Sequence, residues 1–223
     1  MGDLILPNSQ NNQVGMYDEK VFNEVAVAST KYLPRVSLMG SNSKQVVEGK
    51  VSVGKYLLIK DSNNYIDLTN EFNALILAWR PLAMRLDGDA IITEFDPQSE
   101  VFKKIMADSE TPDSGCMWGP DFLLALPNHG CATYFASSKT SRREAQNAMP
   151  ILKGTRMATF RSHLIPGAKF KWWGPLIGVC SVKEAFVNMP DQATVDAEFA
   201  KFINPDKSQA VEQAKETGAA RER

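Results

Sequence analysis

The sequence is poor in the side chains that build disulfide and zinc sites. Three cysteines and two histidines occur among 223 residues, with no C-x-x-C pair and no H-E-x-x-H pattern. An odd number of widely spaced cysteines argues against a disulfide framework and against a structural zinc site. We therefore expect neither a metal ion nor another cofactor, and we expect a reducing cytoplasm as the natural setting.

Long apolar runs and an excess of one charge are also missing. No stretch approaches the roughly 18 consecutive apolar residues of a membrane-spanning helix. The first residues, MGDLILPNSQNNQ, carry an acid where a signal peptide needs basic residues. The formal net charge is -1, from 25 basic and 26 acidic residues, so the overall charge predicts neither a membrane nor a nucleic-acid partner. We expect a cytoplasmic protein without a membrane partner.

The motifs of common enzyme classes do not occur. The patterns G-x-x-x-x-G-K-[ST], G-x-G-x-x-G and G-x-S-x-G are absent, so nothing indicates nucleotide hydrolysis, dinucleotide binding or a hydrolase nucleophile. A group of carboxylates, Asp87, Asp89, Glu94 and Asp96, has the oxygen ligands that Mg²⁺ takes at nuclease sites. A turn with solvated acids is the simpler interpretation. We predict a protein that is not an enzyme.

Strand-like patterns dominate the middle of the chain. Residues 1–15 and 204–223 are polar and are expected to be a flexible arm and tail, which leaves residues 16–203 as one globular domain. Inside that domain, β-branched and aromatic runs alternate with Gly, Pro, Asn and Asp. We expect strands at residues 35–39, 50–60, 65–68, 74–79, 90–95, 122–126 and 131–135, with hairpin turns at 61–64 and 127–130.

Three helices are expected between the strands. One begins at Asp96 and Pro97, a second is capped by Ser138 or Thr140, and a third begins near Asp191. Residues 116–120, Cys-Met-Trp-Gly-Pro, are expected to form a compact loop. The pattern predicts an α+β fold that is mainly β, either an OB-like small barrel or a sandwich, with two to three short helices.

Charge is unevenly distributed along the chain. Residues 139–183 contain nine Lys or Arg and one acid, whereas residues 87–121 contain nine acids and two lysines. Aromatic residues interleave with the basic stretch. Single-stranded nucleic acid is held by this combination, because cations follow the phosphates while flat rings stack on unpaired bases.

The strand period refines this hypothesis. In residues 169–173, Lys169, Lys171 and Trp173 fall on one face of a strand, with the intervening residues on the other face. The alternative interpretation, which the sequence leaves open, is that the aromatic residues are core and the cations a solvated face. The predicted nucleic-acid-binding residues are Tyr134, Arg142, Arg143, Arg156, Phe160, Arg161, Lys169, Lys171 and Trp173.

Residues 122–180 contain FLLALPN, CATYFASSKTSRREA, TRMATFRS and FKWWGPLIGVC. This segment resembles small bacteriophage-encoded proteins of replication modules, and its organisation is similar to that of phage single-stranded DNA-binding proteins of the OB type. The resemblance implies an OB-like barrel, sequence-tolerant binding of single-stranded DNA in replication or recombination, and a place in the host cell cytoplasm. Such proteins commonly end in an acidic tail, whereas this sequence ends Ala-Arg-Glu-Arg, which puts tail-mediated contacts in doubt.

The sequence therefore predicts a non-enzymatic single-stranded DNA-binding protein in which the acidic segment could pair with the basic face of another copy. The first alternative is a viral structural or assembly protein whose oppositely charged segments meet across subunits. The second alternative is a Mg²⁺-dependent nuclease at the carboxylate group.

Overall fold

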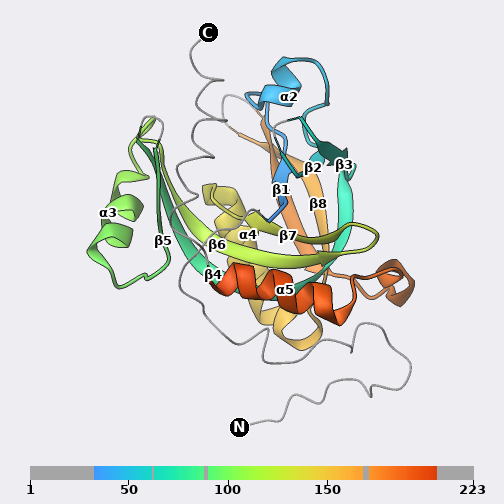
Figure 1. Cartoon of the computed structure of the whole chain (residues 1–223). Coiled ribbons are helices and arrows are strands. Elements are labelled where there is room, and N and C mark those ends of the chain that lie inside the picture. The colour runs from blue at the N-terminus through green and yellow to red at the C-terminus, as the bar shows by residue number, and fades with distance from the viewer. Residues whose placement is uncertain (1–32, 62, 88–89, 168–170, 205–223) are drawn as a thin grey trace.

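The computed structural model describes residues 33–61, 63–87, 90–167 and 171–204. They form one mixed sheet of nine strands with the path β3-β2-β1-β7-β6-β4-β8-β9, and β5 pairs with β4 off this path (Figure 1). The strands are β1 (Arg35–Leu38), β2 (Tyr56–Ile59), β3 (Tyr65–Asp67), β4 (Glu71–Asp87), β5 (Ala90–Glu94), β6 (Cys116–Leu126), β7 (Gly130–Phe135), β8 (Met157–Pro166) and β9 (Lys171–Val179). The helical segments are α2 (Lys44–Val47), α3 (Glu100–Asp108), α4 (Lys139–Thr155), the 3-10 turn η2 (Lys183–Phe186) and α5 (Gln192–Ile203).

The predicted class, α+β and mainly β, is confirmed. The hydrogen-bonded path of the sheet has two ends, at β3 and β9, so the described strands do not form a closed barrel. The OB-type barrel expected from the sequence is therefore not confirmed. None of the helices in the described ranges is long and apolar enough to cross a membrane.

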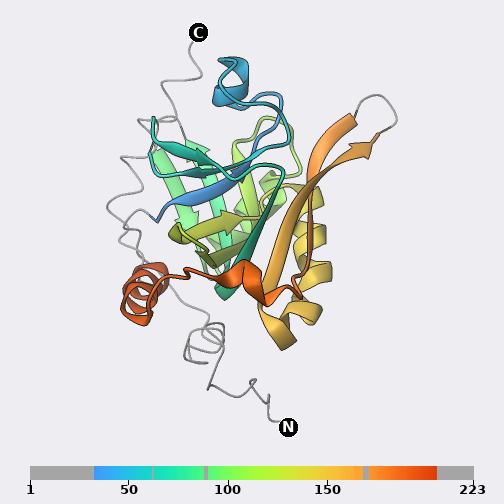
Figure 2. The ribbon, with the colours of Figure 1, turned by 90° about the vertical axis from the view of Figure 1, so that its right-hand side faces the viewer.

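The central strand β4 is buried on both faces because a cluster of apolar side chains lies on each side of it. One cluster gathers the aromatic rings of Tyr56, Phe72, Phe122, Tyr134 and Phe160 and is closed by apolar residues of α4. The other cluster lies under η2 and α5. Figures 1 and 2 show α5 and α4 on different sides of the sheet, with α4 beside the β8–β9 hairpin. The sheet is thus the middle layer between two helical elements.

The three expected helices are present. The N-caps of α4 and α5, Ser138 and Asp191, match the sequence signals, whereas α3 begins after Ser99 and not at Asp96 and Pro97 as expected. The side chains of Ser99, Ser138 and Asp191 accept hydrogen bonds from backbone N–H groups of the first turns of α3, α4 and α5. Such caps satisfy N–H groups that have no partner inside the helix. The expected hairpins β2–β3 and β6–β7 are also confirmed.

Two local predictions were wrong. The strand expected at residues 50–60 begins only at Tyr56, because Gly54 adopts a φ of +85° in the turn before it. Residues 116–120 are not a loop but the first half of β6, since they pair in register with residues 81–85 of β4. That pairing is a long-range interaction. Gly119 and Pro120 are residues typical of turns, so the local sequence pattern favours a loop at this position.

The ends of β4 and β6, together with β5 and α3, form a projection that we call the arm (residues 82–118 as far as they are described). It has a small core of its own, in which Phe102 and Ile105 of α3 pack on Ala83 and Cys116, with Trp118 against them. Figure 1 shows the arm at one side of the sheet.

A buried ion pair lies at the base of the arm. Arg80 Nε donates to Asp121 Oδ2 over 3.1 Å, and only 5% of Arg80 and 3% of Asp121 is exposed. The guanidinium carbon lies 4.2 Å from the ring centroid of Phe95 and 4.1 Å from that of Phe202, and the same group donates to the Phe202 carbonyl. Burial lowers the pKa of Arg80 and raises the pKa of Asp121, and the opposite charge of the partner counters each shift.

We expect Asp121→Leu to lower the free energy of unfolding by about 3–5 kcal/mol, because it leaves the Arg80 charge buried without its partner. Arg80→Met combined with Asp121→Leu should recover most of that loss, since neither buried charge then remains. Urea denaturation followed by circular dichroism measures both. Lys103→Ala, which removes the exposed pair of Lys103 with Glu100, is the control and should change stability by about 1 kcal/mol or less. If Asp121→Leu lowered the free energy of unfolding no more than Lys103→Ala does, the Arg80–Asp121 pair would not have the stabilising role assigned to it.

Candidate nucleic-acid interface

Helix α4 begins with cations where helices favour acids. Its N-cap is Ser138, and Lys139 and Arg142 follow in the first turn, with Arg143 next to them and no acid in that turn. The N-terminus of a helix carries partial positive charge, so each cation there costs about 0.3–1 kcal/mol. Among the described residues, none of the three forms a salt bridge. No acidic side chain of the described chain therefore forms an ion pair with the cations at this helix end.

A cleft of about 620 Å³ opens at the same helix end. The arm supplies one wall, the first two turns of α4 supply the floor, and the β8–β9 hairpin supplies the other wall. Its lining residues are Glu110, Trp118, Lys139, Thr140, Arg142, Arg143, Gln146 and Trp172. Three cations and two indole rings thus share one hollow.

Arg142 is fixed in the cleft by contacts on several sides. Its guanidinium carbon lies 4.4 Å from the Trp118 ring centroid, and Nη1 donates to the carbonyl oxygens of Trp118 (3.1 Å) and Ser137 (2.6 Å). Burial lowers the pKa of the Arg142 guanidinium, and the nearby Glu110 carboxylate opposes this shift. Gly119 leaves room for this side chain, since a Cβ there would lie 3.0 Å from Arg142 Cγ and 2.2 Å from the Ala136 carbonyl oxygen.

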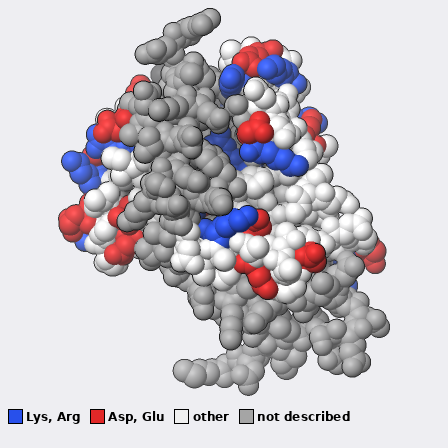
Figure 3. Space-filling model, in the orientation of Figure 1, with Lys and Arg blue, Asp and Glu red and all other residues white. Residues whose placement is uncertain are grey.

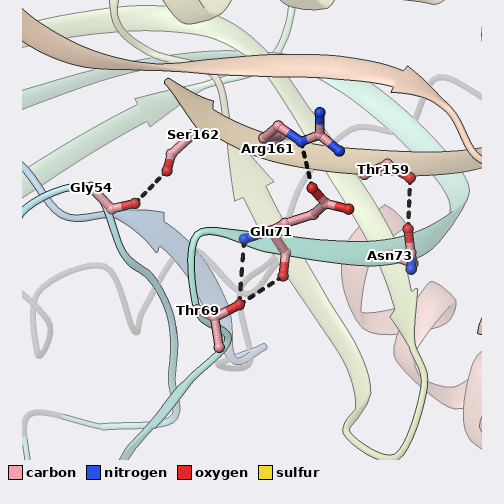
Figure 4. Close-up of polar contacts among 7 residues, drawn as sticks. All are labelled: Gly54, Thr69, Glu71, Asn73, Thr159, Arg161 and Ser162. Atoms are coloured by element: carbon pink, nitrogen blue, oxygen red, sulfur yellow. Dashed lines mark hydrogen bonds and ion pairs between the residues drawn. The ribbon is translucent and has the colours of Figure 1, made fainter. Parts of the chain in front are cut away.

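The two adjacent tryptophans of β9 have different environments. Trp172 is 40% exposed and lines the cleft. Trp173 covers Gly54, where an added Cβ would lie 2.5 Å from Trp173 Cδ2. The Ser162 hydroxyl on the neighbouring strand β8 donates to the Gly54 carbonyl, so both strands of the β8–β9 hairpin contact this turn (Figure 4). Of the two rings, Trp172, and not Trp173, lines the cleft.

Tyr134 and Phe160, predicted as stacking platforms, lie in the core. Their side chains are 4% and 0% exposed, and their rings meet edge to face with centroids 5.2 Å apart. Burial raises the pKa of the Tyr134 hydroxyl. Neither ring is accessible to a base, because β7 and β8 direct both toward the aromatic cluster.

The structure separates the predicted cations. Arg142 and Arg143 lie in the cleft, whereas Arg161 pairs with Glu71 on neighbouring strands (Figure 4). Arg156 is the C-cap of α4, roughly 25 Å from its N-terminus at 1.5 Å per residue. Lys171 is exposed next to Trp172 but does not line the cleft. Lys169 lies outside the described residues.

Sequence reasoning missed Trp118, Trp172 and the particular role of Lys139. The position of Lys139 immediately after a Ser N-cap was a signal, since it places a cation at the positive end of a helix. On the face seen in Figure 3, acidic and basic residues are interspersed on the described surface, and neither sign forms a continuous field.

The carboxylate group predicted as an alternative Mg²⁺ site gains no support in the described residues, where no group of three or more His, Cys, Asp or Glu is placed to hold a metal. Glu94 Oε1 accepts hydrogen bonds from the N–H groups of Phe95 and Asp96, and Asp96 accepts one from Gln98. Asp89 lies outside the described residues. Glu94 and Asp96 thus stabilise the turn that leads into α3.

A smaller hollow of about 300 Å³ lies between the β3–β4 turn and the β6–β7 hairpin, with Asp67 and His129 at its lining. It contains no Lys or Arg.

Comparison with family models, with curated proteins and with solved structures finds no match to this chain. The larger cleft is therefore the candidate site in the described part of the chain.

The exposure of the two β9 tryptophans is directly testable. We expect Trp172→Phe to remove more of the acrylamide-quenchable fluorescence than Trp173→Phe, because Trp172 is the exposed ring. Steady-state quenching of the folded wild type and of both variants measures the difference, and circular dichroism checks that each variant is folded. Equal loss in both variants would contradict the assignment of Trp172 to the cleft.

Proposed function

We propose that this chain binds single-stranded DNA through the cleft at the N-terminus of α4. The observation that carries the proposal is the placement of Lys139, Arg142 and Arg143 at the positive end of a helix, beside the exposed ring of Trp172. An anionic ligand offsets the unfavourable charge at such a helix end. The ring in the same hollow favours a ligand that has flat bases as well as phosphates.

The residues of the cleft differ in the part of the strand that they contact. Lys139 and the exposed Arg143 have side chains free to follow phosphates, while Arg142 supplies a fixed charge. Trp172 stacks on a base, an interaction that contributes about 1–3 kcal/mol per base. The flat face of that base must be free, which is the case in a single strand but not in a duplex, where neighbouring bases cover it. The cleft volume lies within the roughly 300–1,000 Å³ of typical ligand sites, so it takes only a short part of a strand.

The biological setting is part of the proposal. Residues 122–180, which carry the resemblance to phage single-stranded DNA-binding proteins, include the whole of α4 and Trp172. This supports a non-enzymatic role in phage DNA replication or recombination, in the host cell cytoplasm. Self-association along a strand would be compatible with this role.

Binding is measured by fluorescence anisotropy of a labelled 30-nucleotide single strand, with duplex DNA for comparison. We expect preference for the single strand, and a loss of about fivefold to 100-fold on Trp172→Ala. Arg143→Ala should reduce the salt slope by about 0.7. Lys153→Ala, at the other end of α4, is the matched control and should bind as the wild type does. No binding at low salt would remove the proposal and favour the assembly alternative.

The charge at the start of α4 predicts opposite effects on stability and on binding. We expect Lys139→Glu to raise the free energy of unfolding by about 0.3–1 kcal/mol or more, because an acid suits the helix N-terminus, and to weaken strand binding. Lys153→Glu in the last turn should instead lower stability and leave binding unchanged. Urea denaturation and anisotropy on the same preparations test this, and a destabilised Lys139→Glu would count against a ligand-directed charge.

A further inference from the structure

Glu110 is the only carboxylate among the residues that line the cleft. It lies just beyond α3, on the arm wall, where its backbone N–H bonds to the Ala107 carbonyl. In the described part of the chain, no hydrogen bond or salt bridge to its carboxylate is formed, although its charge acts on Arg142. Arg142 is otherwise engaged, because its Nη1 donates to two carbonyl oxygens. The Glu110 side chain is exposed and available to a ligand.

A carboxylate in this position orients a bound strand. Phosphates are repelled by Glu110 and attracted by Lys139 and Arg143, so the backbone follows α4. The bases then face the arm wall and the ring of Trp172. The edge of a base that stacks on Trp172 is thereby brought toward Glu110.

We propose that Glu110 reads this base edge and gives the cleft a preference for cytosine over thymine and uracil. The inference rests on the proposed function and names a specificity-determining residue within it. An ionised carboxylate only accepts hydrogen bonds. Cytosine presents the amino donor N4 at the position where thymine presents the O4 acceptor, and Glu accepts from cytosine N4. Strand binding is then sequence-tolerant through phosphates and stacking, with one position biased by an acceptor.

Three labelled 12-nucleotide strands, dC, dU and dT, test the inference by anisotropy at pH 8. Cytosine and uracil share a ring without the methyl group, so their comparison isolates the amino group from the contribution of the thymine methyl. We expect the wild type to bind the dC strand about fivefold or more tightly than the dU strand, the lower end of discrimination by a base-edge contact.

Glu110→Gln distinguishes a hydrogen bond between Glu110 and a base edge from a mere repulsion of phosphates by its charge. Its amide both donates and accepts, so the ratio of dC to dU affinity should fall toward one, while affinity for all strands rises because a negative charge has left the cleft. Asp113→Asn, an exposed acid on the same loop outside the cleft lining, is the matched control and should keep the wild-type ratio.

The outcomes are distinguishable. An unchanged ratio in Glu110→Gln, or equal binding of dC and dU by the wild type, would overturn the base-reading role and leave strand binding intact. Failure of the wild type to bind any of the three strands would remove the proposed function, and this inference with it.

Discussion

The ion pair of Arg80 and Asp121 fixes the geometry on which the cleft depends. Its guanidinium lies between the rings of Phe95 and Phe202 and donates to both Asp121 and the last turn of α5. One buried group therefore connects the centre of the sheet, the base of the arm and the C-terminal helix. The arm wall, with Trp118 and Glu110, begins within a few residues of this pair, so its orientation follows from the same contacts.

The sheet divides immediately beyond the pair. Pro81 lies opposite Pro120 in the β4–β6 register, and prolines have no N–H to donate to a ladder. Strand β7 pairs with β6 only as far as Asp121. The freed edge of β6 is met by α4, since Arg142 donates to the Trp118 carbonyl. The cleft thus arises where β6 exchanges a strand neighbour for a helix N-terminus.

Local signals predicted the elements that local chemistry determines. Ser138 and Asp191 cap the helices that their positions indicated, and the turn before β3 and the turn around Asn128 and His129 join hairpins as expected. The strand at residues 116–120 was not predictable in this way, because its partner lies more than 30 residues away in β4.

The exposed faces of the aromatic residues could not be read from the sequence either. A period of two places Trp172 and Trp173 on opposite faces, but the close approach of Gly54, which is distant in the sequence, decides which ring is covered. Tyr134 and Phe160 likewise lie in a core cluster that is built from several strands. Basic and aromatic composition therefore did not identify the individual residues that line the cleft.

The cations at the start of α4 are tolerated because the rest of the helix is held by other contacts. Ala145, Ala148 and Leu152 pack into the aromatic cluster, and the Glu144 carboxylate accepts a hydrogen bond from the Ile177 N–H on the outer edge of β9. Apolar burial of about 25 cal/mol per Å² along three helical turns outweighs a charge penalty of about 1 kcal/mol per side chain. The core thus supplies the stability that the helix end gives up, and the unfavourable charges remain in place, where an anionic strand would relieve them.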